Sequence, residues 1–154
     1  MVTKMRDNEV IRLQIPGEMR YVSVARQAVE AVTEQLQLPG DARMAVKLAV
    51  GEACNNAVQH ARRDEQRDGS VMVACRALPD ALEIDVTNQG NGFHPPVRAA
   101  MPESADLLEH GRGMALMEMM MDSVEYLSEN GDTTVRMRKR RPVAEPTAQF
   151  PEAA

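Results

Sequence analysis

A polar stripe within an apolar segment is the first feature of the sequence that could do chemistry. Glu52 is the only charged residue between positions 48 and 61. Four more polar residues follow it at offsets of three, four, seven and eight: Asn55, Asn56, Gln59 and His60. In a helix these offsets place side chains on one face. Because buried polar groups need partners, this face must meet water, an ion, a ligand or a neighbouring loop, and the spacing alone leaves these open.

Two glycine-containing segments are the next candidates. NQGNGF, at residues 88–93, directly follows a predicted strand, and Gly-x-Gly lets the backbone approach a ligand closely. HGRGM, at residues 110–114, is predicted as a loop that runs into a helix, where free N–H groups would suit phosphate. Each motif is weak alone, since ordinary turns use the same residues. Neither is a Walker loop or a dinucleotide fingerprint, because the Gly-Lys-Ser/Thr ending and the strand–Gly-x-Gly-x-x-Gly–helix unit are absent.

Hydrophobic periodicity predicts the elements that must position these segments. Alternation predicts strands at 9–15, 70–78, 82–88, 123–128 and 133–139, and helical spacing predicts helices at 18–36, 42–61 and 113–121. Asp41 is predicted to cap the second helix. Strands therefore come in adjacent pairs while the helices come separately. This order favours an α+β fold, a two-layer α/β sandwich whose mixed, mostly antiparallel sheet carries its helices on one face.

Length and composition indicate one globular domain over residues 1–141. The tail at 142–154 is rich in Pro, Ala and Glu and is predicted to be disordered. A formal net charge of −5 argues against nucleic acid as a direct partner. Cys54 and Cys75 lie in apolar stretches without metal-ligand spacing, so we expect buried free thiols in a reducing compartment. Without a signal-peptide pattern or a membrane-spanning run, the expected location is cytoplasmic, with no membrane partner.

The order of these segments resembles the GHKL, or Bergerat-fold, ATPase superfamily with its histidine-kinase-like ATPase domain. Within it, the chain is most similar to the anti-sigma-factor serine kinases of bacterial partner-switching systems. GEACNNAVQHA looks like the family's N-box, and NQGNGF looks like its first glycine box, usually Asp-x-Gly-x-Gly. HGRGMALMEMMMDSVEY looks like the second glycine box with the helix and strand that follow, and NGDTTVRMRK looks like the closing strand. The resemblance covers about residues 9–140, which is nearly the whole predicted domain.

The resemblance implies roles for the residues of the first two motifs. Glu52 would be the general base that orients or deprotonates the attacking hydroxyl. Asn56 would bind Mg²⁺ through its side-chain oxygen, beside the phosphates of ATP. Asn88 stands where the family has the Asp that reads adenine, and Gly90 and Gly92 would let the chain pass close to that base.

The same resemblance implies a phosphate lid and a second adenine contact. Gly111, Arg112 and Gly113 would bind phosphate through their backbone N–H groups. The helix that starts at Met114 would point its positive end at the phosphates. Thr134, from the Thr-Thr pair of the closing strand, would help to hold the adenine.

The function that the resemblance implies is ATP-dependent phosphorylation of a Ser or Thr on a small STAS-like antagonist protein. In its other state the chain would sequester a sigma factor or another output protein. Two departures from the family, the uncharged Asn88 and an acidic Asp132 where Gly is common, favour an alternative: a non-catalytic partner-binding module with weak or no ATP binding. A third reading, the ATPase domain of a histidine kinase, ranks lower because the first predicted helix contains no His. The sequence leaves undecided whether the chain forms a homodimer.

Overall fold

The computed structural model describes residues 4–61, 69–89, 105–129 and 131–142. Gly90 and Gly92, and all of the predicted tail except Pro142, lie outside these ranges. The described residues form five strands, three α-helices and one short 3₁₀ helix. In chain order these are β1 (Val10–Ile15), η1 (Met19–Tyr21), α1 (Val22–Gln35), α2 (Gly40–Ala61), β2 (Val71–Ala77), β3 (Ala81–Gln89), α3 (Ala105–Met120), β4 (Ser123–Glu129) and β5 (Asp132–Arg140).

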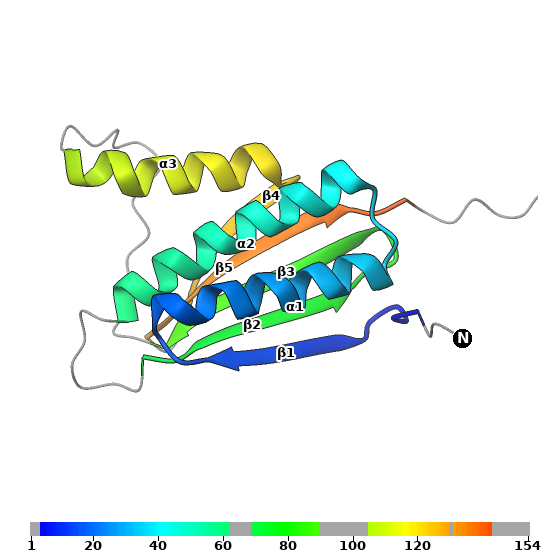
Figure 1. Cartoon of the computed structure of the whole chain (residues 1–154), viewed down its shortest axis with the longest axis horizontal. Helices are drawn as coiled ribbons and strands as arrows, with labels where there is room; N and C mark the ends of the chain where they lie inside the picture. The colour runs from blue at the N-terminus through cyan, green and yellow to red at the C-terminus, as the bar shows by residue number, and fades with distance from the viewer. Residues whose placement is uncertain (1–3, 62–68, 90–104, 130, 143–154) are drawn as a thin grey trace, which may run out of the picture.

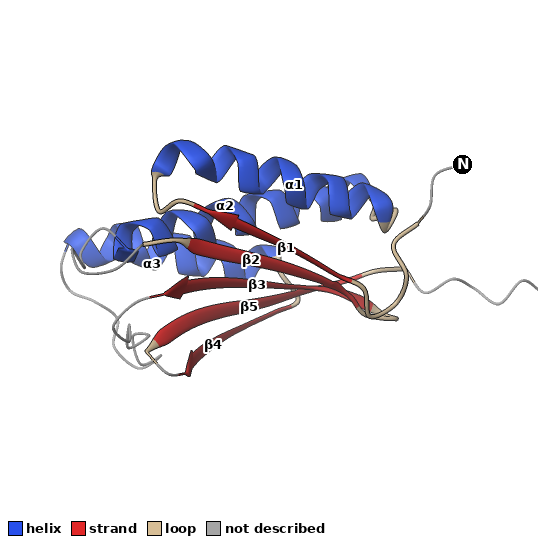
Figure 2. Cartoon of the chain, turned by 90° about the horizontal axis from the view of Figure 1, so that it is seen from below, coloured by secondary structure: helices blue, strands red, loops and turns tan. Residues whose placement is uncertain are grey.

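The strands make a single sheet in the order β1-β2-β3-β5-β4. All three α-helices lie on the same face of this sheet, with α2 between α1 and α3 (Figures 1 and 2). The predicted α+β two-layer sandwich is therefore confirmed. The expectation of a mixed sheet is wrong for the described strands, because each of the four strand pairs is antiparallel.

The core lies between the helices and the inner face of the sheet. On β2 the buried residues alternate with half-buried or exposed ones, so Val71, Val73, Cys75 and Ala77 face the helices. Because α2 is the middle helix, it buries apolar residues on several sides, and Ala49, Val50, Ala53 and Val58 are nearly inaccessible. Each large apolar side chain buried in this way contributes about 1.5–3 kcal/mol to stability. This packing fixes the orientation of α2, and with it the direction in which its polar residues point.

The two cysteines are free and buried, as predicted. Burial, and then the neighbouring Cys75, raises the pKa of Cys54 to about 12. Burial, and then the negative charge of Asp85, raises the pKa of Cys75 to about 12. Both thiols are therefore protonated at neutral pH and behave as small apolar core residues.

Helix α3 begins earlier than predicted. The expected start at Gly113 is wrong, because α3 runs from Ala105 to Met120 and includes both glycines of the second glycine segment. Glycine lowers helix stability by about 1 kcal/mol relative to Ala, which is why the two glycines indicated a loop. Burial of Met117 against the core, where it is 0% exposed, outweighs that local preference.

Two smaller differences concern the first half of the chain. The predicted helix at 18–36 divides into η1 and α1. Asp41 lies inside the first turn of α2 and does not precede it, because α2 already starts at Gly40. An acidic residue in that turn still interacts favourably with the positive end of the helix. Among the described residues, no helix is both long and apolar enough to cross a membrane.

Candidate functional site

Glu52 and Asn56 lie half-buried on α2, one helical turn apart. The residues next to them, Ala53 and Ala57, are buried in the core. Helix α3 packs against the polar residues through Gly113. A Cβ atom added at Gly113 would lie 2.8 Å from Oε2 of Glu52 and 3.7 Å from Nδ2 of Asn56. The structure thus brings together residues from the first and third sequence motifs, although they are about sixty positions apart.

The close approach explains why position 113 is a glycine. A distance of 2.8 Å is shorter than real Cβ contacts, so any other residue would push the Glu52 carboxylate away. Gly113 is itself buried, whereas its neighbour Arg112 is exposed. The glycine therefore allows α3 to lie directly on the carboxylate of α2.

The structure corrects the predicted phosphate-binding loop. Gly111, Arg112 and Gly113 lie inside α3, where backbone N–H groups bond to carbonyl oxygens four residues earlier. Met114 lies in the middle of the helix, and the positive end of α3 is at Ala105. In this conformation the backbone N–H groups of Gly111–Gly113 are not presented to an anion. Met114 does not begin the helix, so no positive helix end lies at this position either.

Asn88 is a buried polar residue at the end of β3. It lies two positions after Val86 and four after Ile84, both of which face the helices in the core, so Asn88 faces the same side. The residue is 7% exposed, and its Oδ1 has no hydrogen-bond partner among the described residues. An unpartnered buried acceptor costs about 1–3 kcal/mol. A ligand that donates a hydrogen bond here, such as the amino group of adenine, would satisfy this atom.

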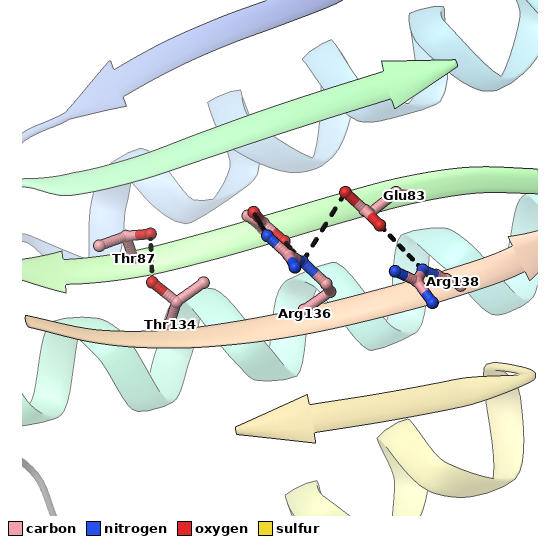
Figure 3. Close-up of polar contacts among 6 residues, drawn as sticks. Glu83, Thr87, Thr134, Arg136 and Arg138 are labelled. Carbon is pink, nitrogen blue, oxygen red and sulfur yellow. Dashed lines mark hydrogen bonds and ion pairs between the residues drawn. The ribbon is translucent and has the colours of Figure 1, made fainter. Parts of the chain in front are cut away.

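The structure places the two threonines of the Thr-Thr pair on opposite faces of the sheet. Thr134 lies opposite Thr87 in the β3–β5 register, and their hydroxyl oxygens are 2.8 Å apart on the sheet face away from the helices (Figure 3). Thr134 therefore cannot act together with Asn88. Thr133 lies directly opposite Asn88, and it is 7% exposed on the helix side. A base beside Asn88 would therefore meet Thr133 and not Thr134.

Asp132 faces away from the helices, because its side chain points to the same face as that of Thr134. Its negative charge would repel a nucleotide beside Asn88 only if the side chain faced the helices. One of the two departures from the family pattern therefore lies away from the candidate site. Gly90 and Gly92, which were predicted to lie near the base, are outside the described residues.

Comparison with known proteins establishes the family. A family model described as a histidine kinase-like ATPase domain matches residues 15–139. The chain belongs to this family. Membership implies an ATP-binding fold, which agrees with a buried acceptor at Asn88 and a Glu–Asn pair on α2.

Relatives of the chain within the family are serine-protein kinases named RsbW. The protein from Bacillus velezensis is 36% identical over 138 residues, which cover 85% of each chain. The protein from Bacillus subtilis is 32% identical over 143 residues, which cover 88% of each chain. The similarity thus extends over nearly the whole length of both relatives.

Two solved structures share the fold of the chain. The RsbU and RsbW domains of a Mycobacterium tuberculosis protein superpose with a TM-score of 0.63 at 16% identity, covering 90% of this chain and 35% of that one. The SiaB–SiaC complex of Pseudomonas aeruginosa gives a TM-score of 0.56 at 14% identity, covering 83% of this chain and 88% of that one. At these identities the comparison concerns the fold alone.

Proposed function

We propose that the chain is a cytoplasmic, ATP-dependent protein serine/threonine kinase of the partner-switching type. Its substrate would be a small antagonist protein, and its second partner would be a sigma factor or another output protein. The observation that carries this proposal is the meeting of Glu52, Asn56 and Gly113 where α3 packs on α2. The names of the serine-protein kinases that resemble the chain over most of its length support the same reaction.

Glu52 and Asn56 would act side by side on the transferred phosphoryl group. Glu52 would orient the substrate hydroxyl and accept its proton, because a half-buried carboxylate is a suitable base at close range. Asn56 would hold Mg²⁺ through its amide oxygen. When bound, the ion supplies neutralising charge at the phosphates. Among the described residues no cluster of three His, Cys, Asp or Glu could hold a metal ion.

Asn88 and Thr133 would bind the adenine. The unpartnered Oδ1 of Asn88 would accept a hydrogen bond from the amino group of the base. Thr133 lies opposite in the register and shares the same buried side of the sheet. An uncharged acceptor binds this donor less strongly than the family's carboxylate, by about 1 kcal/mol, so we expect a weaker but real ATP site.

Phosphate binding would require part of α3 to open. In the described conformation the N–H groups of Gly111–Gly113 belong to the helix, and Gly113 lies against Glu52. Two glycines lower the helix stability by about 1 kcal/mol each, so unwinding at these positions costs little. The released N–H groups would then bind the phosphates, and Glu52 would become accessible to a substrate hydroxyl.

Two measurements test the proposed kinase. Calorimetry with MgATP should detect binding to the wild type and at least tenfold weaker binding to Asn56→Ala. Phosphate transfer from labelled ATP to STAS-domain antagonist proteins should fall at least a hundredfold in Glu52→Gln, while ATP affinity changes little. Absence of ATP binding in the wild type, or unchanged transfer in Glu52→Gln, would contradict the proposal.

A second candidate is a partner-binding module on the same fold with little or no kinase activity. The uncharged Asn88 at the position of the family's Asp favours it. The variant Asn88→Asp separates the two functions. A large gain in ATP affinity would support the binding module, because the native residue would then have lost its function. A gain of no more than about fivefold, which corresponds to the ~1 kcal/mol expected when a carboxylate replaces the amide, would support the kinase.

A further inference from the structure

The sheet face away from the helices carries ordered charges. In the register, Arg76 of β2, Glu83 of β3 and Arg138 of β5 lie opposite one another across three adjacent strands. The neighbouring row contains Asp85 opposite Arg136. Side chains at these positions alternate with the buried core residues, so they point away from α2, as Figure 3 shows for Glu83, Arg136 and Arg138.

Acids and arginines occupy different depths on this face. The Glu83 side chain is only 9% exposed, although no helix covers it, whereas the Arg138 side chain is 41% exposed. Nε of Arg138 donates to Oε2 of Glu83 at 2.8 Å. Arg136 donates two hydrogen bonds to Asp85, each 2.9 Å long, and its Nε is 3.7 Å from Oε1 of Glu83. The carboxylates therefore lie beneath the guanidinium groups and hold them in place.

Two further arginines lie on this face. Arg12 of β1 and Arg76 of β2 are exposed, and neither forms an ion pair with any residue that the structure describes. Arg12 lies opposite Ala74, two positions from Arg76 on the same strand, so the two are diagonal neighbours about 7–8 Å apart. Glu83 faces Arg76 in the register but forms its ion pairs with the arginines of β5.

Together these residues form a cationic strip. It consists of Arg12, Arg76, Arg138 and Arg140, and it crosses the half of the sheet nearest the β2–β3 connection. Of the acids on this face, Glu83 is sunk beneath the strip, Glu125 of β4 lies opposite Arg136 beside the strip, and Glu129 and Asp132 lie at the far ends of β4 and β5. At the edge of the sheet, the carboxylate of Asp122 accepts a hydrogen bond from the backbone N–H of Arg140. The surface offered to a partner is positive, although the whole chain carries −5.

We propose that this cationic strip is a docking surface for an acidic segment of a partner protein. Carboxylates of the segment would pair with the exposed guanidinium groups of Arg12 and Arg76. Arg138 is already fixed by Glu83, so little side-chain freedom is lost when it binds a further acid. A net negative chain repels the long phosphate backbone of a nucleic acid, whereas a short acidic segment meets only the local strip.

The surface is separate from the proposed nucleotide site. The strip lies on the sheet face away from the helices, and Glu52, Asn56 and Asn88 lie on the helix side. Loss of acidic-segment binding therefore leaves ATP affinity unchanged, and the two proposals can fail independently.

A fluorescent oligoglutamate peptide is the probe for this surface. Its binding is measured by fluorescence anisotropy at low ionic strength, where exposed charges are poorly screened. The variant Arg12→Gln/Arg76→Gln should weaken binding by at least about fivefold, because it removes two exposed contacts of ~0.5–1 kcal/mol each. The matched control Arg20→Gln/Lys47→Gln removes the same charge from the helix layer and should weaken binding by less than about twofold.

The outcomes distinguish a specific docking surface from a general effect of the protein's net charge. A selective loss in Arg12→Gln/Arg76→Gln, with MgATP affinity and circular dichroism unchanged, supports the proposal. Equal losses in both variants overturn it, as does the absence of peptide binding by the wild type. Tighter binding of single-stranded DNA, or of phosphatidylserine vesicles, by the same arginines also overturns it. If the double variant does not fold, the single variant Arg140→Gln replaces it. A selective loss of peptide binding in this variant supports the proposal, and unchanged peptide binding overturns it.

Discussion

A difference of one residue decides which threonine of β5 belongs to the candidate site. Because side chains alternate along a strand, neighbouring residues point to opposite faces of the sheet. The sequence contained the necessary signal: Val135 and Met137 are apolar, whereas Arg136 and Arg138 are charged. Position 133 shares the parity of the apolar pair and therefore faces the core, as the structure shows. The resemblance identified the Thr-Thr pair, but only the alternation distinguishes its members.

Replacing each threonine in turn tests this assignment. Thr133→Val should weaken MgATP binding by about fivefold, because it removes a hydroxyl beside Asn88 worth ~1 kcal/mol. Thr134→Val should leave the affinity unchanged and lower the free energy of unfolding by about 0.5–1.5 kcal/mol, because its hydrogen bond to Thr87 is lost. Calorimetry and urea denaturation measure the two effects. The opposite pattern of affinities would place the adenine on the other face of the sheet and contradict the site.

At the scale of whole elements, the contact between α2 and α3 controls the candidate catalytic residues. Glu52 and Asn56 are fixed by the packing of α2, while Gly113 brings α3 against them. Strand and helix periodicity predicted six of these elements within a few residues, because the core imposes regular burial on them. The start of α3 could not be predicted in this way, since residues 105–113 contain two glycines and their helical state depends on packing against α2.

The contact between Glu52 and Gly113 could not be predicted from the local sequence pattern either. Each residue lies in a motif that the sequence revealed, but their contact depends on how two helices pack. The resemblance supplied the roles of Glu52 and Asn56, and the structure supplied the reason for a glycine at position 113. The described conformation also shows a helix where the sequence indicated a phosphate-binding loop.

A methyl group at position 113 tests whether this contact matters. Gly113→Ala places a Cβ 2.8 Å from Oε2 of Glu52, so the carboxylate must move. We expect phosphate transfer to fall about fivefold, because alanine stabilises the helical state of α3 by about 1 kcal/mol and so raises the cost of the opening that phosphate binding requires. The free energy of unfolding should change by less than about 1 kcal/mol, because the helix gains stability from alanine while the flexible carboxylate shifts.

Gly40→Ala is the matched control, since a Cβ added at Gly40 has no neighbour within 4 Å. It should leave both phosphate transfer and ATP affinity unchanged. Equal activity of Gly113→Ala and the wild type would contradict the proposed opening of α3 at this glycine.

At the scale of the whole molecule, the two sheet faces have different chemistry. The helix side contains the apolar core, the buried thiols and the candidate nucleotide residues, whereas the other side carries the arginines and their carboxylates. The hydrogen bond from Arg136 to Asp85 raises the pKa of the guanidinium, so this charge persists at every pH at which the protein folds. The groups whose ionisation should first lower the free energy of unfolding at alkaline pH therefore lie on the helix side of the sheet.

Cys54 and Cys75 should make the protein lose stability above about pH 9. Their pKa values are raised from 9.0 to about 12 in the folded state, mainly by burial. Between these values the unfolded chain releases thiol protons that the folded chain retains, so rising pH favours unfolding. The stabilising contribution is complete below about pH 9 and is lost as the pH rises toward 12. At pH 10 the loss should be about 1.4 kcal/mol for each cysteine.

Urea denaturation at several pH values between 8 and 10 measures this effect. The double variant Cys54→Ala/Cys75→Ala should be less stable than the wild type at pH 8, because two buried sulfur atoms leave small cavities. Its stability should nevertheless fall less steeply with pH, since lysine and tyrosine side chains contribute equally to both proteins. Converging curves would therefore confirm the burial of two neutral thiols between α2 and β2. Parallel curves would mean that the thiols ionise as readily in the folded protein as in the unfolded chain, which is incompatible with the described core.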